Sequence, residues 1–219
     1  MKNLSITLTA AAMLAIFGCN NADKHNEAAT VAPDTTTTTE KLEASVPTAP
    51  MDSAAMMKAW QEYMTPGDMH KLLASAEGKW DAEMRFWQSA DAAPSEPSKS
   101  TVETKMALGG RYQVSEYKGT MMGVPFEGKE TTAYDNAKKK FITTWIDNTG
   151  TGMMYMEGTY DAAAKSLNMA GKMIDPSTGQ ECDMRQVIKM VDDKTQVMEM
   201  YDTKGGKEYK SMEIKLTKK

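Results

Sequence analysis

The sequence predicts an all-β domain: an up-and-down β-barrel of about ten antiparallel strands, preceded by one or two short helices. Apolar and polar residues alternate with period two over most of the chain after residue 77, which is typical of strands with one buried face. Short turn signals separate these segments at regular intervals, which favours hairpins. A long sheet with one apolar face removes its exposed edges by closing on itself.

The alternation begins in residues 80–86, where four apolar residues are separated by charged ones, and it returns in residues 101–108. Later segments repeat this alternation, and in each of them the apolar residues occupy every second position. These residues are Leu167, Met169, Met173, Met184, Ile188, Met190, Met212, Ile214 and Leu216. The turn signals between segments are Gly109-Gly110, Asp135-Asn136, Asp161-Ala162, Pro176-Ser177-Thr178-Gly179, Asp192-Asp193 and Lys204-Gly205-Gly206. Together they predict a meander in which each strand pairs with the next.

Two helical segments are expected before the strands, in residues 51–77. Asp52 and Ser53 can cap the first, whose apolar face carries Met56, Met57, Trp60 and Met64. The second is expected to begin at Thr65-Pro66-Gly67-Asp68, with proline at the first helical position. His70, the only histidine after residue 50, is expected to be exposed on this second helix.

Residues 1–18 have the pattern of a bacterial secretory signal. Lys2 precedes residues 4–17, an uncharged and mostly apolar stretch that is too short to span a bilayer but right for a signal peptide. The stretch leads into Ile16-Phe17-Gly18-Cys19, which resembles the lipobox of bacterial lipoproteins. The resemblance implies that Cys19 is lipidated and becomes the mature N-terminus. A plain signal peptide without lipidation is the alternative.

Residues 19–50 are expected to form a disordered tether after the lipidated cysteine. The segment from residue 20 has no aromatic residue and contains a run of threonines at 35–39, so it cannot bury enough apolar surface to fold. The domain then divides into a helical lead-in, residues 51–77, and the barrel, residues 78–219. The expected location is the cell envelope, with the protein anchored to a membrane and facing the periplasm or the cell exterior.

Composition narrows the class of protein. A net charge of −4 over 219 residues argues against a nucleic-acid partner. Two cysteines cannot make a disulfide scaffold, and two histidines cannot make a histidine-rich metal site. No cofactor fingerprint, phosphate loop or nucleophile elbow is present. The sequence therefore predicts no metal, no cofactor and no catalytic residues, although an enzyme stays open as an alternative.

Methionine is unusually frequent. The chain has 21 methionines, of which Met1 and Met13 precede residue 51, so the domain has 19. Clusters such as Met153-Met154 resemble thioether sites for Cu(I). The favoured interpretation is that methionine replaces leucine in the core, where it suits pockets that accept varied apolar ligands.

Two resemblances bear on the fold. Gly78-Lys79-Trp80, at the switch from helix to strand, is similar to the Gly-x-Trp element of lipocalins and related calycin barrels, which implies that Trp80 closes one barrel end against the helix. An ordinary core tryptophan is the alternative.

The segment from about residue 64 to 218 resembles an uncharacterised bacterial family catalogued as domain of unknown function 1579. That resemblance rests on Met64-Thr65-Pro66-Gly67-Asp68-Met69-His70-Lys71-Leu72, Gly109-Gly110-Arg111-Tyr112, Ser115-Glu116-Tyr117-Lys118-Gly119-Thr120-Met121-Met122-Gly123, Tyr134-Asp135-Asn136, Trp145-Ile146-Asp147-Asn148 and Met156-Glu157-Gly158-Thr159-Tyr160. It implies no activity.

Polar residues that lie on the otherwise apolar face of a predicted strand are the candidate ligand-binding residues. Glu116 follows Tyr112 and Val114 on the same strand face and is expected to point inward. It would serve there as a ligand anchor or proton carrier, or as a structural residue paired with Arg111 or a lysine near the barrel mouth. Gln186 is expected to point inward among Cys182, Met184, Ile188 and Met190. Trp145 with Asp147, and Tyr155 with Glu157, could form an aromatic wall with acidic tips, or pack as ordinary core and strand-end residues.

Residues 141–148 and 153–160 have apolar side chains on both strand faces. One face must look outward, so the sequence predicts that the helices, a second copy in a homodimer or a partner covers it.

The first functional hypothesis is a lipid-anchored barrel that binds a small, mostly apolar molecule through Glu116, Trp145, Tyr155, Glu157 and Gln186. A structural or protein-interaction lipoprotein with a filled barrel is the alternative. A small-molecule enzyme that uses an inward carboxylate is a further one.

Overall fold

In the described part of the chain, ten strands follow two helices. The strands are β1 (Gly78–Phe86), β2 (Ser98–Ala107), β3 (Tyr112–Met121), β4 (Val124–Asp135), β5 (Lys140–Asp147), β6 (Met154–Asp161), β7 (Ser166–Ile174), β8 (Glu181–Asp192), β9 (Thr195–Lys204) and β10 (Lys207–Lys218). The computed structural model describes residues 52–121, 123–176, 178–204 and 206–219. The signal peptide, Cys19 and the tether predicted in residues 1–50 lie outside the described residues.

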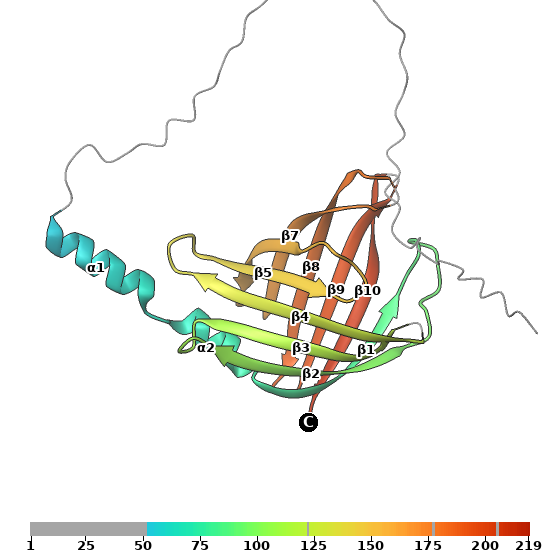
Figure 1. The fold of residues 1–219 in the computed structure, drawn as a ribbon, viewed down its shortest axis with the longest axis horizontal. Coiled ribbons are helices and arrows are strands. Elements are labelled where there is room, and N and C mark those ends of the chain that lie inside the picture. The colour runs from blue at the N-terminus through green and yellow to red at the C-terminus, as the bar shows by residue number, and fades with distance from the viewer. Residues whose placement is uncertain (1–51, 122, 177, 205) are drawn as a thin grey trace, which may run out of the picture.

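The strands close into one antiparallel barrel (Figure 1). Each strand pairs with its neighbours in the chain, and β1 completes the ring by pairing with both β2 and β10. At this seam Trp80 lies opposite Val102 on one side and Lys218 on the other. The predicted up-and-down barrel is therefore confirmed, and each described strand is paired on both sides.

Burial follows the alternation that the sequence predicts. In β1, Trp80, Ala82 and Met84 are at most 3% exposed, while the charged residues between them face solvent. Aromatic and methionine side chains occupy much of the barrel interior, and Phe141, Met156 and Met169 are at most 1% exposed. Methionine thus does occupy core positions, where its flexible thioether chain fills irregular gaps.

Helix α2 (Asp68–Ser75) lies at the end of the barrel where β1 begins. It packs on β2, β3 and β4 through its buried Leu73. Three bonds hold its C-terminal end: Gln113 Nε2 donates to the Leu73 carbonyl at 2.7 Å, Trp80 Nε1 to the Ala76 carbonyl at 3.0 Å, and Lys218 Nζ to the Ser75 carbonyl at 3.3 Å. The helix therefore covers this end of the barrel.

The start of α2 differs from the prediction in two ways. Gly67, in an extended conformation, is the N-cap, so Pro66 precedes the helix instead of opening it. His70 is only 6% exposed, not exposed as expected. Its Nδ1 accepts a hydrogen bond from the Gly67 amide at 3.1 Å, and its ring packs edge-to-face on Tyr134. Burial, with a smaller contribution from the Arg111 charge, holds the pKa of His70 below its usual value.

Helix α1 (Ser53–Met64) begins at Asp52, whose carboxylate accepts from the Ala54 amide at 3.1 Å, as the capping pattern predicts. Every residue of α1 is exposed, and the helix projects away from the barrel (Figure 1). Two barrel turns hold its C-terminal end: Arg111 Nη2 donates to the Met64 carbonyl at 2.8 Å, and Asn136 Nδ2 to three carbonyls.

Among the described residues, no helix is both long and apolar enough to cross a membrane.

Replacing Asn136 with alanine is expected to loosen α1 and leave the barrel intact. The Asn136 amide reaches the carbonyls of Glu62, Tyr63 and Thr65 at 2.9–3.1 Å, and α1 buries no residue of its own. Hydrogen–deuterium exchange should become faster in residues 53–64, while the global stability changes by less than about 1 kcal/mol. Unchanged exchange in α1 would contradict this role for Asn136.

Candidate functional site

A cavity of about 50 Å³ lies inside the barrel beneath α2. Leu72, Leu73 and Ala76 line it from the helix side. Its polar wall consists of Thr104, Gln113, Ser115, Glu130, Thr132 and Gln196. The remaining lining is aromatic or aliphatic: Trp80, Val102, Tyr117, Phe141, Leu167, Ile188, Met190, Met198 and Leu216.

Glu130 is the only ionisable carboxyl in this lining. Its side chain lies on the inward face of β4 with those of Phe126 and Thr132, and it is 7% exposed. Within the described residues its carboxylate accepts one hydrogen bond, from Thr132 Oγ1 at 3.2 Å. Burial raises the pKa of Glu130 to about 7, because the Thr132 bond offsets only part of the lost hydration. Near neutral pH this group can therefore either hold a proton or accept one from a ligand.

Paired hydroxyl groups make up much of the polar wall. Thr104 Oγ1 and Ser115 Oγ lie 2.9 Å apart, and Thr132 Oγ1 and Thr143 Oγ1 are also separated by 2.9 Å. Each pair joins neighbouring strands, β2 to β3 and β4 to β5. The hydroxyls satisfy one another, so they form a fixed wall around the Glu130 carboxyl.

Tyr117 contributes a neutral phenol beside this wall. It is 3% exposed, and burial, with a smaller effect of the Glu130 charge, raises its pKa well above the usual value. Its Oη forms no hydrogen bond with the described residues and remains a donor. Apart from Gln196 of β9, the polar groups of the lining come from β2, β3 and β4, whereas β7, β8 and β10 supply Leu167, Ile188 and Leu216. Such a cavity suits a molecule with an apolar body and a polar end.

Trp145 points into the barrel but does not line this cavity. Its ring lies over Gly128, where a Cβ atom would come within 2.4 Å of the indole. It packs edge-to-face on Tyr117 at 5.0 Å and is stacked on Phe126. Its Nε1 donates to Asp147 at 2.6 Å. Trp145 therefore fills the barrel interior on the side of the cavity away from α2.

Gln186 also points inward, as predicted, and is 2% exposed. Its Nε2 donates to Met198 Sδ at 3.0 Å, whereas its Oε1 is buried without a hydrogen-bond partner among the described residues. It does not line the cavity.

Replacing Gln186 with methionine is expected to stabilise the fold by about 1 kcal/mol. The change nearly preserves volume and removes a buried carbonyl oxygen that has no hydrogen-bond partner within the described residues. Urea denaturation checks this. Destabilisation of similar size would mean that Oε1 is hydrogen-bonded in solution.

Glu116 does not point inward as expected. It is exposed and lies 3.6 Å from Lys129 Nζ, while its neighbours Ser115 and Tyr117 are buried. The inward face of β3 carries the small hydroxyl residue Ser115, and the outward face carries Val114. The more apolar face of β3 is therefore not the one that points into the barrel.

Tyr155 and Glu157 also lie on the outer face, so the predicted aromatic and acidic cavity wall is wrong for this pair. Met156 between them is fully buried, which turns both neighbours outward. Glu157 accepts from Tyr155 and pairs with Lys138 at 2.8 Å and Lys140 at 3.4 Å. Hydrogen bonds from Lys138 and Tyr155 lower the pKa of Glu157 to about 2.

Sequence reasoning missed Glu130. The signal was present, because Glu130 shares the parity of Phe126 and Tyr134. Gly128 and Thr132 stand between these aromatic residues, so the inner face of β4 does not have a continuous apolar pattern. Burial in the folded barrel shows that the set of alternate residues with Glu130 faces inward, whereas Glu127 on the other set is exposed.

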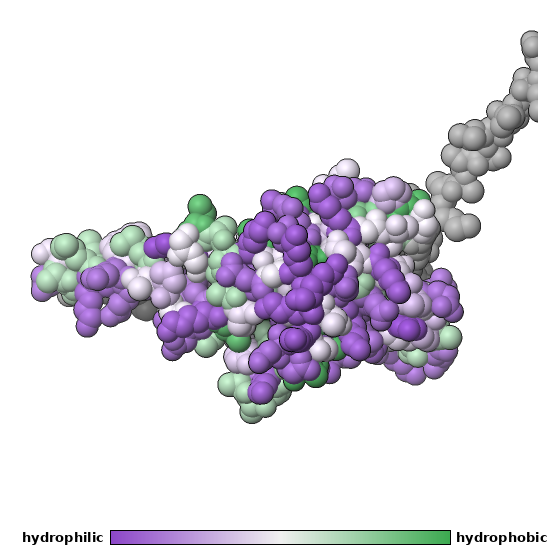
Figure 2. Space-filling model, turned by 90° about the horizontal axis from the view of Figure 1, so that it is seen from below, coloured by the Kyte–Doolittle hydropathy of each residue, from purple (hydrophilic) through white to green (hydrophobic). Residues whose placement is uncertain are grey.

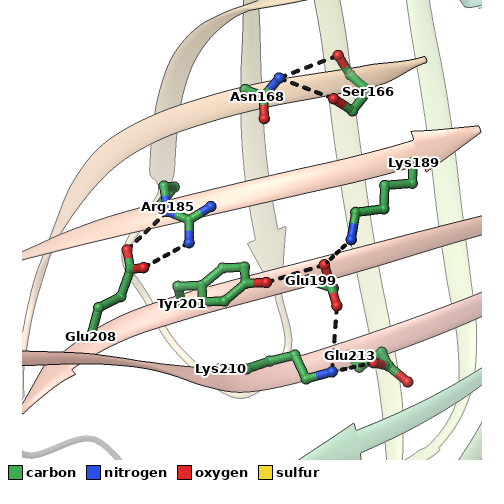
Figure 3. A network of polar contacts seen from close by, with 9 residues as sticks. All are labelled: Ser166, Asn168, Arg185, Lys189, Glu199, Tyr201, Glu208, Lys210 and Glu213. Carbon is green, nitrogen blue, oxygen red and sulfur yellow. Dashed lines mark hydrogen bonds and ion pairs between the residues drawn. The ribbon is translucent and has the colours of Figure 1, made fainter. Parts of the chain in front are cut away.

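The outer face of β8–β10 carries a polar network that is separate from the cavity (Figure 3). Arg185 forms two bonds with Glu208, at 2.8 and 2.7 Å, and stacks over the Tyr201 ring. Glu199 accepts from Lys189 at 2.8 Å and from Tyr201 at 3.1 Å. Burial opposes ionisation of Glu199, but these bonds outweigh it and lower its pKa. The network joins three strands across the outside of the barrel.

These features define a closed ten-stranded antiparallel barrel with a partly polar interior cavity and one buried carboxyl in its wall. The chain belongs to the family described as protein of unknown function (DUF1579), whose model matches residues 65–218. No curated protein matches the chain. The family membership expected from the sequence motifs is confirmed, while the similarity to lipocalins at Gly78-Lys79-Trp80 stays a prediction.

Proposed function

We propose that this protein is a lipid-anchored barrel of the cell envelope that binds a small, mostly apolar molecule carrying a hydrogen-bond donor. The observation that carries the proposal is Glu130, a buried carboxyl in the wall of an interior cavity that has one hydrogen-bond partner among the described residues. A carboxyl removed from water is costly unless its oxygens are hydrogen-bonded. A donor on a bound molecule would supply the bond that the described residues do not.

The lining supports an amphipathic ligand. Its apolar body would contact the wall that includes Leu167, Ile188 and Leu216, and its donor would face Glu130. The phenol of Tyr117 is available to an acceptor on the same molecule.

The cavity volume limits the size of the ligand. About 50 Å³ is small beside the roughly 300–1,000 Å³ of common ligand pockets. A ligand larger than a few heavy atoms would need Leu72 and Leu73 of α2 to move outward. The same small volume favours a second candidate function, a structural or protein-interaction lipoprotein with a filled barrel.

The membrane anchor is supported by the signal-like residues 1–18 and the lipobox that ends at Cys19. Two or three acyl chains on Cys19 would hold the protein firmly, since a single chain binds a bilayer only marginally.

Native mass spectrometry of the full chain, extracted from membranes in mild detergent without added ligand, tests both parts. The expected result is a mass that includes acyl groups on Cys19 together with a stoichiometric organic adduct. Glu130→Gln should lose most of this adduct. Glu116→Gln is the matched control, because it makes the same change on the outer face of the neighbouring strand, and it should keep the adduct.

Each other outcome has a defined meaning. An adduct retained in Glu130→Gln would remove Glu130 from the site. A wild-type mass without an organic adduct would favour the structural or protein-interaction lipoprotein with a filled barrel. A chain without acyl groups would overturn the membrane anchor, and the presence of the adduct alone would then decide whether a ligand is bound.

A further inference from the structure

The first turns of the structure expose an unusually apolar helix face. We define the α1 face as Met56, Met57, Trp60, Tyr63 and Met64, which are 47–74% exposed. The opposite side of the helix carries Gln61 and the Lys58–Glu62 pair, whose Nζ and Oε1 lie 3.9 Å apart. An amphipathic helix normally buries such a face. No residue of α1 is buried.

In the described part of the chain, the hydrogen bonds from the barrel to α1 lie at the C-terminal end of the helix. Arg111 bridges the helix and the β2–β3 turn, because Nη2 donates to the Met64 carbonyl at 2.8 Å and Nη1 to the Leu108 carbonyl at 3.1 Å. Leu108 is itself 74% exposed and adopts a left-handed φ of 48°. The apolar surface thus includes the barrel turn next to the helix. Figure 2 shows α1 extending from a barrel whose visible face is mostly hydrophilic.

We infer that the α1 face lies in the headgroup region of the membrane to which the chain is anchored. This inference rests on the lipid anchor in the proposed function. Residues 20–51 separate Cys19 from the helix cap at Asp52, so anchoring makes the contact between α1 and the bilayer intramolecular. Trp60 and Tyr63 are of the residue types that favour the membrane interface.

Charge around the helix fits an anionic lipid surface. Arg111 and Lys139 lie on the two turns that adjoin α1, and both are exposed. Neither forms an ion pair with the described residues. Basic side chains beside an interfacial helix strengthen its binding to anionic lipids.

A second copy of the chain fits the α1 face less well. A helix of 12 residues is about 18 Å long and about 10 Å wide. One face of such a helix offers much less than the roughly 800 Å² per partner that a stable interface buries.

Tryptophan quenching by lipid tests the inference. The acylated full chain is reconstituted in vesicles of phosphatidylethanolamine and phosphatidylglycerol, with or without lipid brominated in the upper part of its acyl chains. Of the four tryptophans only Trp60 is more than half exposed. The brominated lipid should quench the wild type, and Trp60→Phe should abolish most of this quenching. Trp87→Phe is the matched control, because Trp87 follows the far end of β1, and it should keep the quenching.

The outcomes separate this inference from the anchor. An acylated chain that stays on the vesicles without Trp60 quenching would overturn the inference and leave the anchor standing. Unquenched Trp60 together with a dimer that Met57→Glu dissociates would assign the α1 face to a second copy. A chain without acyl groups on Cys19 would overturn the anchor and this inference with it.

Discussion

Replacing Glu130 with glutamine is expected to stabilise the fold by about 3 kcal/mol at pH 8 and to change its stability little at pH 4. Burial raises the pKa of Glu130 from 4.5 to about 7 in the folded protein. Between these values the folded state holds a proton that the unfolded state has lost, so the stability of the wild type falls as pH rises through this range. Each pKa unit corresponds to about 1.4 kcal/mol. Glutamine does not ionise, so the stability of the variant does not fall in this way as the pH rises.

The measurement is urea denaturation of wild type and variant at several pH values from 4 to 8. Asp202, whose pKa burial also raises, contributes to the pH dependence of both proteins and cancels in the difference. Glu116→Gln is the matched control, because it makes the same change at an exposed position on the neighbouring strand. A Glu130→Gln difference that is equal at pH 4 and pH 8 would mean that Glu130 is hydrated in solution.

The same variant connects stability with the proposed function. If Glu130 accepts a hydrogen bond from a ligand, glutamine should stabilise the empty protein and weaken ligand retention together. A merely structural carboxyl would produce the stability change alone.

Replacing Gly158 with alanine is expected to destabilise the fold by about 3 kcal/mol or more. A Cβ atom at this position would lie 1.9 Å from the carbonyl oxygen of Asn168 and 2.7 Å from Met169 Sδ. The nearest obstacle is backbone, and Gly158 is paired with Phe141 in β5 and Met169 in β7. Relief of the clash must therefore separate strands in a closed barrel, which costs more than a side-chain rotation.

Gly150→Ala is the matched control for this prediction. Apart from Gly150 itself and its two neighbours in the chain, no heavy atom of the described residues lies within 4 Å of a Cβ built on Gly150. Its substitution should change stability by less than about 1 kcal/mol. Chemical denaturation of both variants and the wild type makes the comparison. Equal stabilities of the two variants would show that β6 and β7 are not so closely packed at Gly158.

Local patterns in the sequence were sufficient for the order and type of the elements. Alternation with period two marks strands wherever one face is packed, and short turn signals join neighbours, so ten strands in a meander follow from residues close together in the chain. The motifs that indicate the family are also local. The carboxylate of Asp52 caps α1 as its position in the sequence predicts, because capping involves residues only a few positions apart.

The candidate site depended on contacts between distant residues. The choice of inner face in β3 is made by pairing with β2 and β4, which turns Ser115 inward and Glu116 outward. Glu130 becomes a buried acid only because α2 and the strands surround it. A strand alternates its side chains by its own geometry, but which alternate set meets the core is decided by the rest of the barrel. The sequence alone therefore determined the elements and their order, while the tertiary structure decided which polar side chain lies inside.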